Sequence, residues 1–213
     1  MSEKSRVDFW FDPFCPWSWI TSRWILEARQ VRDFDLEFHL LALAVLNEDN
    51  LPPQFSDPRI MAKVWAPTRV LAAAEQAKGR AILEPLYTAI GSRMHSNDNK
   101  EILDVLRRDF DKVIAEALEE VGLPAELAEA ATSEEYYGAM SRSIDEGLNV
   151  AGSIAGVPTI HINGRPFFGP VLGSIPRGEQ AGRLWDAVET LGTNPDFWEL
   201  KSEQPEDLRP NMT

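Results

Sequence analysis

The sequence contains a single cysteine, Cys15, among its 213 residues, so no disulfide can form within the chain. That usage suits a reducing compartment, and it leaves stability to a packed core. The three histidines, His39, His95 and His161, lie too far apart in the sequence to suggest a zinc site with one cysteine. We therefore expect no metal, and we expect each histidine to be a helix or strand residue with a satisfied ring.

Long apolar runs and positive charge are also scarce. No stretch is apolar over the length that a membrane span needs. The turn predicted at Asp12-Pro13 comes before the apolar core of a signal peptide could develop. With 21 lysines and arginines against 34 acidic residues, the net charge of −13 would repel a phosphate backbone. We expect a cytoplasmic protein that binds neither nucleic acid nor membrane.

What the sequence does contain is the composition of a folded protein, with 44% hydrophobic and 26% charged residues. The apolar run 6–11 predicts a buried strand, and the helical spacing that starts at Pro16 predicts a helix to about residue 32. The partly alternating run 35–43 predicts a second strand. Strand, helix and strand in this order form a βαβ unit, whose two strands should be parallel.

The region from about residue 55 to residue 150 has helical patterns and no convincing strand pattern. We expect one of its helices to be interrupted or restarted at Pro67. Strand patterns return on both sides of Asn163-Gly164, a pair that favours a two-residue type I′ turn. This part of the chain therefore predicts a β-hairpin.

A last amphipathic helix is predicted over 177–191, followed by an acidic, proline-containing tail that we expect to be irregular. The predicted domain organisation is an α/β domain in two pieces, 1–52 and 151–192, with a helical insertion domain over 53–150 and a tail over 193–213.

Cys15 follows the first predicted strand and begins the first predicted helix, in the stretch FDPFCPWSWI. In open α/β folds, chemistry tends to occur at this carboxyl edge of the sheet. The unpaired N–H groups and the dipole at a helix N-terminus stabilise a thiolate over a thiol. We therefore expect Cys15 to be a nucleophile whose pKa lies below that of a free cysteine. The alternative is an inert core cysteine in a protein that only binds.

A Val-Pro dipeptide, Val157-Pro158, stands immediately before the third predicted strand and is compatible with a cis peptide bond. The order of elements resembles that of a thioredoxin-like protein, and the resemblance implies that a proline at this place presents its loop to Cys15.

Three stretches together resemble the DsbA-like thioredoxin superfamily: FWFDPFCPWSWI, GLPAELA in the helical region, and GVPTIHINGRPFFGPVL. With the continuation GPVLGSIPRGEQAGRLWDAV, residues 5–200 are similar to the mycothiol-dependent DsbA-like reductases of the cytoplasmic FrnE-like branch, which include a nitroreductase that activates nitro-aromatic prodrugs. The resemblance implies an α/β thioredoxin-like fold, composed of a βαβ unit, a β-hairpin and a C-terminal helix, with a large all-helical insertion.

The resemblance also implies roles for individual residues. Cys15 would be the nucleophile and Pro158 the cis-proline of the loop that faces it. The backbone of Val157 would pair with a bound thiol ligand, beside Thr159 of the same loop.

Three further residues are candidates for the ligand pocket. Trp17, next to Pro16 inside the motif, would shape the groove beside the sulfur. Asn47, just after the second strand, could belong to the same pocket, and it could equally be an ordinary loop-turn residue.

Ser18 departs from the family pattern, which usually reads Cys-Pro-Trp-Cys. The second cysteine would resolve the mixed disulfide formed on the first, and a serine can only offer a hydrogen bond to the thiolate. Either this is a natural monothiol enzyme, in which a low-molecular-weight thiol performs the resolving step, or the serine is an engineered replacement. The sequence leaves both explanations open, along with a third in which Ser18 only bonds its own backbone.

The family implies a thiol-disulfide oxidoreductase that uses mycothiol as co-substrate, without metal or flavin, and that exchanges with thiolated substrates or reduces nitro-aromatic ones. It would act as a monomer or homodimer. Two alternatives remain: a kappa-class glutathione transferase or the related chromene-carboxylate isomerase, and a thioredoxin-fold protein without catalysis.

The choice between the two small thiols depends on charge. Glutathione carries carboxylates that would favour basic residues around the groove, for which Arg165 and Arg177 are candidates. We expect instead that both arginines are exposed structural charges, so mycothiol is inferred from the resemblance alone.

Overall fold

The computed structural model of the chain describes residues 4–95, 102–148, 156–203 and 210–212. Its four strands form one sheet in the order β2-β1-β3-β4. β1 (Arg6–Phe11) and β2 (Asp35–Leu40) are parallel and are joined by α1 (Pro16–Val31). β3 (Thr159–Ile162) runs antiparallel to β1 and to β4 (Arg165–Phe168). The predicted βαβ unit and β-hairpin are therefore both confirmed.

The hairpin turn has the predicted conformation. Asn163 and Gly164 both have positive φ, at 51° and 81°, as a type I′ turn requires. The Asn163 side chain also accepts a hydrogen bond from the backbone N–H of Arg6 at 2.9 Å. The turn is thereby fastened to the start of β1.

One face of the sheet carries the main apolar core. Val7, Phe9 and Phe11 of β1 point to this face and are completely buried. Helix α1, helix α4 (Leu83–Met94) and helix α7 (Gly178–Thr193) pack on it. The Trp24 indole N–H of α1 donates to a main-chain oxygen of α7 at 3.2 Å, and Tyr87 of α4 stacks on Phe11 at 3.9 Å.

The opposite face is more polar. Trp10 is flanked by the imidazoles of His39 and His161, with ring centroids at 4.1 Å and 4.2 Å. Helix α6 (Tyr137–Leu148) covers this stack, since the Trp10 indole N–H donates to the Ser143 carbonyl oxygen at 3.1 Å. Asp8 lies on the same face and pairs with Arg6 and with His39.

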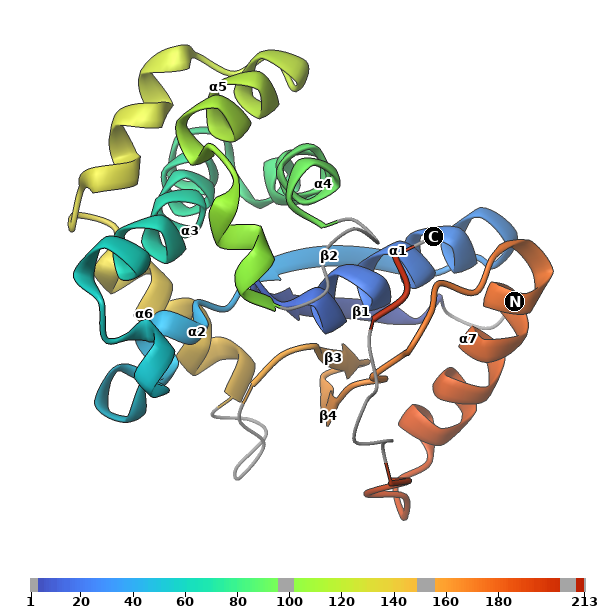
Figure 1. Ribbon diagram of the computed structural model, residues 1–213. Coiled ribbons are helices and arrows are strands. Elements are labelled where there is room, and N and C mark those ends of the chain that lie inside the picture. The colour runs from blue at the N-terminus through green and yellow to red at the C-terminus, as the bar shows by residue number, and fades with distance from the viewer. Residues whose placement is uncertain (1–3, 96–101, 149–155, 204–209, 213) are drawn as a thin grey trace.

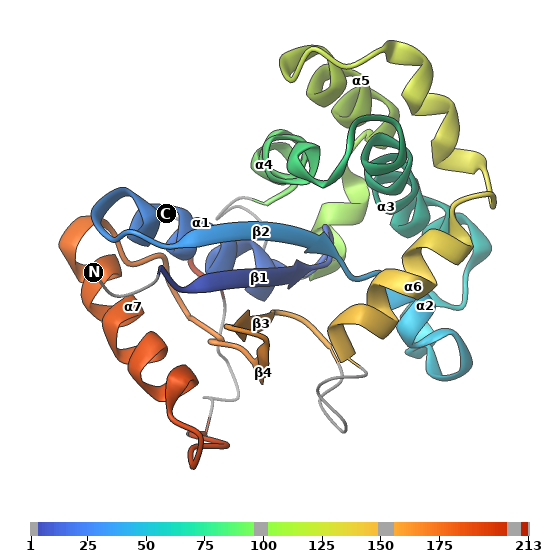
Figure 2. The same ribbon diagram turned by 180° about the vertical axis from the view of Figure 1, so that it is seen from behind.

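The helical insertion lies between β2 and β3 in the chain and gathers beyond the carboxyl ends of β1 and β2 (Figure 1; Figure 2). No strand occurs in its described parts. Its α-helices are α2 (Leu43–Leu46), α3 (Pro58–Lys78), α4, α5 (Phe110–Glu120) and α6, and its 3₁₀ segments are Glu48–Asn50, Pro53–Phe55, Arg80–Ile82, Ile102–Arg107 and Ala125–Thr132.

Several sequence-based boundaries were wrong. α3 continues through Pro67. A proline inside a helix removes one backbone hydrogen bond, and the burial of Pro67 in the packed face of α3 compensates for that loss. The segment 125–132, where the sequence pattern is helical, is a 3₁₀ helix and not an α-helix. β2 ends at Leu40, short of residue 43, and the last helix runs from Gly178 to Thr193. Among the described residues, no helix is both long and apolar enough to cross a membrane.

Candidate functional site

Cys15 occupies the N-cap position of α1, directly after the turn that ends β1. Its backbone is extended, with φ −76° and ψ 113°, and its sulfur accepts a hydrogen bond from the Ser18 N–H at 3.4 Å. Pro16 takes the first helical position, where its missing N–H costs nothing. The predicted placement of the cysteine at a helix start is confirmed.

The Val157–Pro158 peptide bond is cis, as predicted, and its loop reaches the cysteine. The Cys15 Sγ lies 3.8 Å from the Val157 carbonyl oxygen, across 142 positions of sequence. A carbonyl oxygen can only accept, so this contact exists for the thiol S–H and not for the thiolate. The loop is itself fixed by Thr159, whose buried hydroxyl donates to the Gly156 carbonyl oxygen at 2.8 Å.

The predicted acidity of Cys15 is wrong for this conformation. Burial raises the pKa of the thiol, because the sulfur has lost most of its water and only 7% of the residue is exposed. The hydrogen-bonding groups of Ser18 and the Trp17 N–H lower the pKa, and the Asp12 charge raises it. The helix start therefore does favour the thiolate, and burial outweighs it.

Ser18 is completely buried beneath the cysteine. Its backbone N–H bonds the sulfur, and its side chain lowers the Cys15 pKa. The Ser18 hydroxyl nevertheless lacks a hydrogen-bond partner within the part of the chain that the structure describes. A buried hydroxyl without a partner beside a sulfur is available to a charge that develops there.

Asp12 belongs to the same turn, and the sequence reasoning missed it. Its carboxylate is 1% exposed and accepts the N–H of Phe14 at 2.7 Å and of Leu43 at 2.8 Å. Burial raises the Asp12 pKa to about 6, against the lowering effect of these N–H groups. The signal in the sequence is an Asp-Pro pair between a buried strand and a helix, and by itself this pair predicts only a turn.

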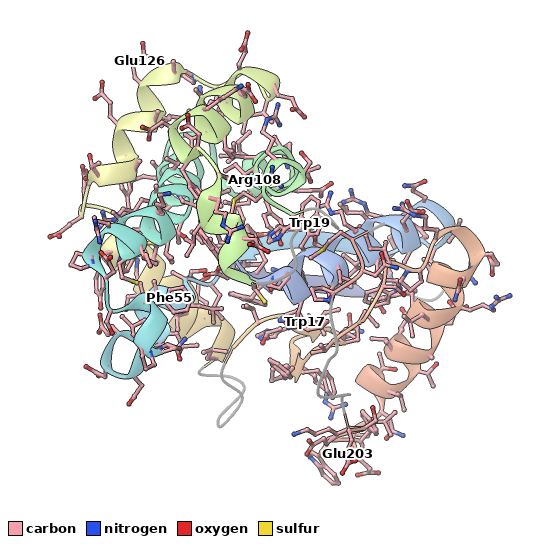
Figure 3. The ribbon with its side chains drawn as sticks, in the orientation of Figure 1. Trp17, Trp19, Phe55, Arg108, Glu126 and Glu203 are labelled. Atoms are coloured by element: carbon pink, nitrogen blue, oxygen red, sulfur yellow. The ribbon has the colours of Figure 1, made fainter. Side chains whose placement is uncertain are left out.

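The remaining predicted pocket residues differ in their placement. Trp17 is partly buried against the core, and Figure 3 shows it on the opposite side of the start of α1 from Trp19. Asn47 caps the end of α2, where its side-chain amide donates to the Leu43 carbonyl oxygen at 2.9 Å. This contact is typical of an ordinary loop-turn residue, which is the alternative to a role of Asn47 in the pocket.

Both arginines considered for glutathione have structural partners. The Arg165 guanidinium donates to the main-chain oxygens of Gly192 at 2.9 Å and of Phe197 at 3.0 Å, which fastens the end of α7 to β4. Arg177 forms an ion pair with Glu27 of α1 at 3.0 Å. The expected structural role is confirmed for both, but only Arg177 is exposed, and Arg165 is partly buried.

Each histidine ring makes one hydrogen bond, through Nε2: His39 to Asp8, His95 to the Pro13 oxygen and His161 to the Gly147 oxygen. The Nδ1 atoms of His39 and His95 have no partner among the described residues, so the prediction of satisfied rings holds only in part.

One group of potential metal ligands lies within the described ranges: Asp8, Glu37 and His39, whose ligand atoms are within 4.8 Å of one another. Arg6 already pairs with Asp8 at 3.0 Å and Arg80 with Glu37 at 3.4 Å. The cations of the protein itself thus balance these carboxylates, and the group is an ion-pair network on the sheet surface.

Comparison with known proteins extends these observations. The sequence model of the Rv2466c-like family, described as mycothiol-dependent nitroreductase Rv2466c, matches residues 14–202. The uncharacterized protein Rv2286c of Mycobacterium tuberculosis is 30% identical over 208 residues, which are 96% of this chain and 85% of that protein.

Solved structures support the fold. The cytosolic disulfide reductase DsbM from Pseudomonas aeruginosa is similar with a TM-score of 0.51 and 20% identity, over 87% of this chain and 99% of that one. A putative protein disulfide isomerase from Nitrosomonas europaea has a TM-score of 0.50 and 13% identity, over 88% of this chain and 98% of that one. The expected thioredoxin-like fold of DsbA type with a helical insertion is thereby confirmed.

Proposed function

The chain belongs to the Rv2466c-like family of mycothiol-dependent nitroreductases, and we propose on this basis that Cys15 exchanges thiols between mycothiol and its mixed disulfides. It is an oxidoreductase of DsbA type, and its co-substrate is a low-molecular-weight thiol. The observation that carries the proposal is the contact between the Cys15 sulfur and the Val157 carbonyl of the cis-proline loop, at 3.8 Å.

The exchange needs two steps. In the first, the Cys15 thiolate attacks the mycothiol sulfur of a substrate mixed disulfide, a new S–S bond forms on Cys15, and the substrate leaves as a thiolate that takes up a proton. In the second, the thiolate of another mycothiol attacks the same mycothiol sulfur. Mycothiol disulfide leaves, and Cys15 is regenerated as a thiolate.

The Val157 carbonyl supports the first step. In the resting site the carbonyl is engaged by the Cys15 S–H. Deprotonation or disulfide formation removes that hydrogen, so the carbonyl becomes free to accept an N–H of the bound thiol. Pairing of Val157 with a ligand is thus coupled to the chemical state of Cys15.

Ser18 explains why the resolving thiol must come from outside. The chain has no second cysteine that could attack the mixed disulfide. The unpaired hydroxyl of Ser18 can instead donate to the Cys15 thiolate when it forms, which makes Cys15 a better leaving group in the second step.

Mycothiol is favoured over glutathione by the charges around the site. Arg165 and Arg177, the two basic residues considered for glutathione carboxylates, are engaged within the fold. Mycothiol presents mainly neutral hydroxyl groups and needs no such cations. DsbM has also been crystallised with GSH, so glutathione is the alternative thiol to test.

Nitro-aromatic reduction is the second activity that the family suggests. Two mycothiols would supply the two electrons that convert a nitro group to a nitroso group, with release of water and mycothiol disulfide. We propose that this takes place at the same cysteine, in the cytoplasm, where reduced small thiols are abundant.

Intact mass spectrometry tests the proposal. The protein is incubated separately with oxidised mycothiol and oxidised glutathione, and the adduct is located by peptide mapping. We expect a mycothiol adduct on Cys15 that a second equivalent of reduced mycothiol removes. Turnover retained in Cys15→Ala would overturn the proposal and favour a transferase or isomerase, in which no protein sulfur reacts.

A further inference from the structure

The turn that precedes Cys15 is held by the helical insertion through His95. This residue caps the end of α4, and only 5% of it is exposed. Its ring Nε2 lies 2.8 Å from the Pro13 carbonyl oxygen, two residues before the cysteine. A side chain from the insertion therefore contacts the backbone of the motif itself.

The contact fixes the tautomer of the ring. Because the Pro13 oxygen can only accept, the proton must be on Nε2 of His95. Nδ1 is then a bare acceptor, and it is buried without a partner among the described residues. Burial lowers the His95 pKa to about 4, with a further lowering by the nearby Arg23 cation, so the ring is neutral at neutral pH.

The ring is also held from the side. It stacks on Trp19 of α1, with centroids 5.5 Å apart and planes at 27°. Leaving Nδ1 buried without a partner destabilises the folded protein. A hydrophobic ring at this position could also stack on Trp19 without burying an unpaired nitrogen. The hydrogen bond to Pro13 is what the histidine adds.

A second contact holds Phe14, the next residue of the turn. Phe14 stacks on Phe110 of α5, with centroids 5.4 Å apart and planes at 17°. The insertion thus holds two consecutive residues, Pro13 and Phe14, immediately before Cys15. On the other side, the Asp12 carboxylate ties the turn to α2 through the Leu43 N–H.

We propose that His95 is a positioning residue: by holding the Pro13 carbonyl, it sets the orientation of the turn and so the exposure and aim of the Cys15 sulfur. The inference rests on the proposed function of Cys15 as nucleophile. Without this hydrogen bond the Pro13–Phe14 peptide is held only at its N–H, by the Asp12 carboxylate at 2.7 Å. Its carbonyl can then tilt, and the N-cap that follows loses its fixed relation to the cis-proline loop.

A pair of amide variants tests this inference. In His95→Gln the side-chain amide nitrogen stands near the position of Nε2, so it can still donate to Pro13. In His95→Asn it stands near the position of Nδ1, so it falls short. Both variants lose the ring stacked on Trp19, which makes each the control for the other.

The readouts are the alkylation rate of Cys15 by iodoacetamide and the rate of exchange with mycothiol mixed disulfides, both under native conditions. For His95→Asn we expect alkylation to rise about fivefold, because the buried sulfur becomes accessible. We expect exchange to fall at least about tenfold, because the sulfur is misaligned. His95→Gln should stay within about threefold of the unaltered protein in both. Equal behaviour of the two variants would overturn the inference, even if both lower the melting temperature.

A measurement on the unaltered protein covers the case in which a variant does not fold. Nitrogen-15 NMR of the His95 ring should show the Nε2–H tautomer at neutral pH, and an Nδ1–H tautomer would overturn the inference. If Cys15→Ala keeps its turnover, the proposed function fails whatever the His95 variants do. If Cys15 is required and the two His95 variants match, the positioning role alone fails.

Discussion

The backbone N–H of Cys15 donates to the Asp12 carbonyl oxygen at 3.1 Å, so that a buried thiol and a buried carboxylate share one turn. Burial raises the pKa of both groups, and the Asp12 charge raises the Cys15 pKa further. Because the Asp12 pKa is about 6, its carboxylate is charged at neutral pH and opposes formation of the Cys15 thiolate.

Asp12→Asn should lower the pKa of Cys15 because it removes a negative charge beside the sulfur. The alkylation rate at pH 7 should rise a few-fold, and its pH profile should shift to lower pH. Since an amide has only one acceptor for the two N–H groups that the carboxylate serves, unfolding should become easier by about 1–3 kcal/mol.

Asp8→Asn is the control for that variant. Asp8 is, like Asp12, a buried carboxylate. It belongs to β1, points to the face of the sheet opposite the main apolar core, and pairs with Arg6 and His39. Its alkylation profile should match that of the unaltered protein. If both variants shift the profile equally, the effect comes from overall destabilisation and not from Asp12.

Ser18→Cys should convert the site to a dithiol. After treatment with oxidised mycothiol, intact mass spectrometry should show a protein lighter by two hydrogens, because the new thiol displaces mycothiol from Cys15. Ser18→Ala should instead keep the adduct and raise the Cys15 pKa, since the side chain of Ser18 lowers it. A stable adduct on Ser18→Cys would show that the two sulfurs cannot meet.

The pH dependence of stability should contain two opposing contributions. The folded-state pKa of Asp12 is raised from 3.8 to about 6, so its contribution is present below about pH 4 and is lost as pH rises towards 6. The folded-state pKa of His95 is lowered from 6.5 to about 4, so its contribution is present above pH 6.5 and is lost as pH falls towards 4. Each amounts to about 3 kcal/mol at most.

Single substitutions should expose each contribution. In His95→Gln the free energy of unfolding, relative to the unaltered protein, should fall as pH rises from about 4 to 6. In Asp12→Asn it should rise over the same range. Urea unfolding at several pH values measures both, and parallel curves for all three proteins would contradict the assigned pKa directions.

Gly91→Ala should destabilise the contact between α1 and α4. A Cβ at Gly91 would lie less than 2.5 Å from the six-membered ring of Trp19, so the indole would have to move. We expect a loss of about 1–3 kcal/mol in the free energy of unfolding. The control is Gly138→Ala in α6, where the nearest atom is a flexible arginine end at 3.6 Å, and where the change should be neutral or stabilising.

The sequence was most informative where the signal is local. The apolar run of β1, the Asn163-Gly164 turn and the proline at the first position of α1 each predict one local element, and each was confirmed. Pro67 misled because a buried helix face can retain a proline that local rules treat as a break. The division of the chain into domains stays a prediction.

The sequence predicted which segments form the candidate site, but it did not predict the direction of the Cys15 pKa shift. The family pattern placed Cys15 and Pro158 together, and the structure brings their segments into contact. The raised pKa of Cys15 depends on its burial in the folded chain, which no local pattern reports. Asp12 and His95 were missed as site residues for the same reason, since their partners lie on other elements.

The two halves of the site are 142 residues apart, which has a consequence for the nascent chain. At a synthesis rate of about 5–20 residues per second, about 7 to 28 seconds pass between the emergence of Cys15 and of Val157 from a ribosome. During that time no cis-proline loop covers the sulfur. The thiol that is buried in the finished protein therefore begins its existence exposed to whatever oxidants surround the ribosome.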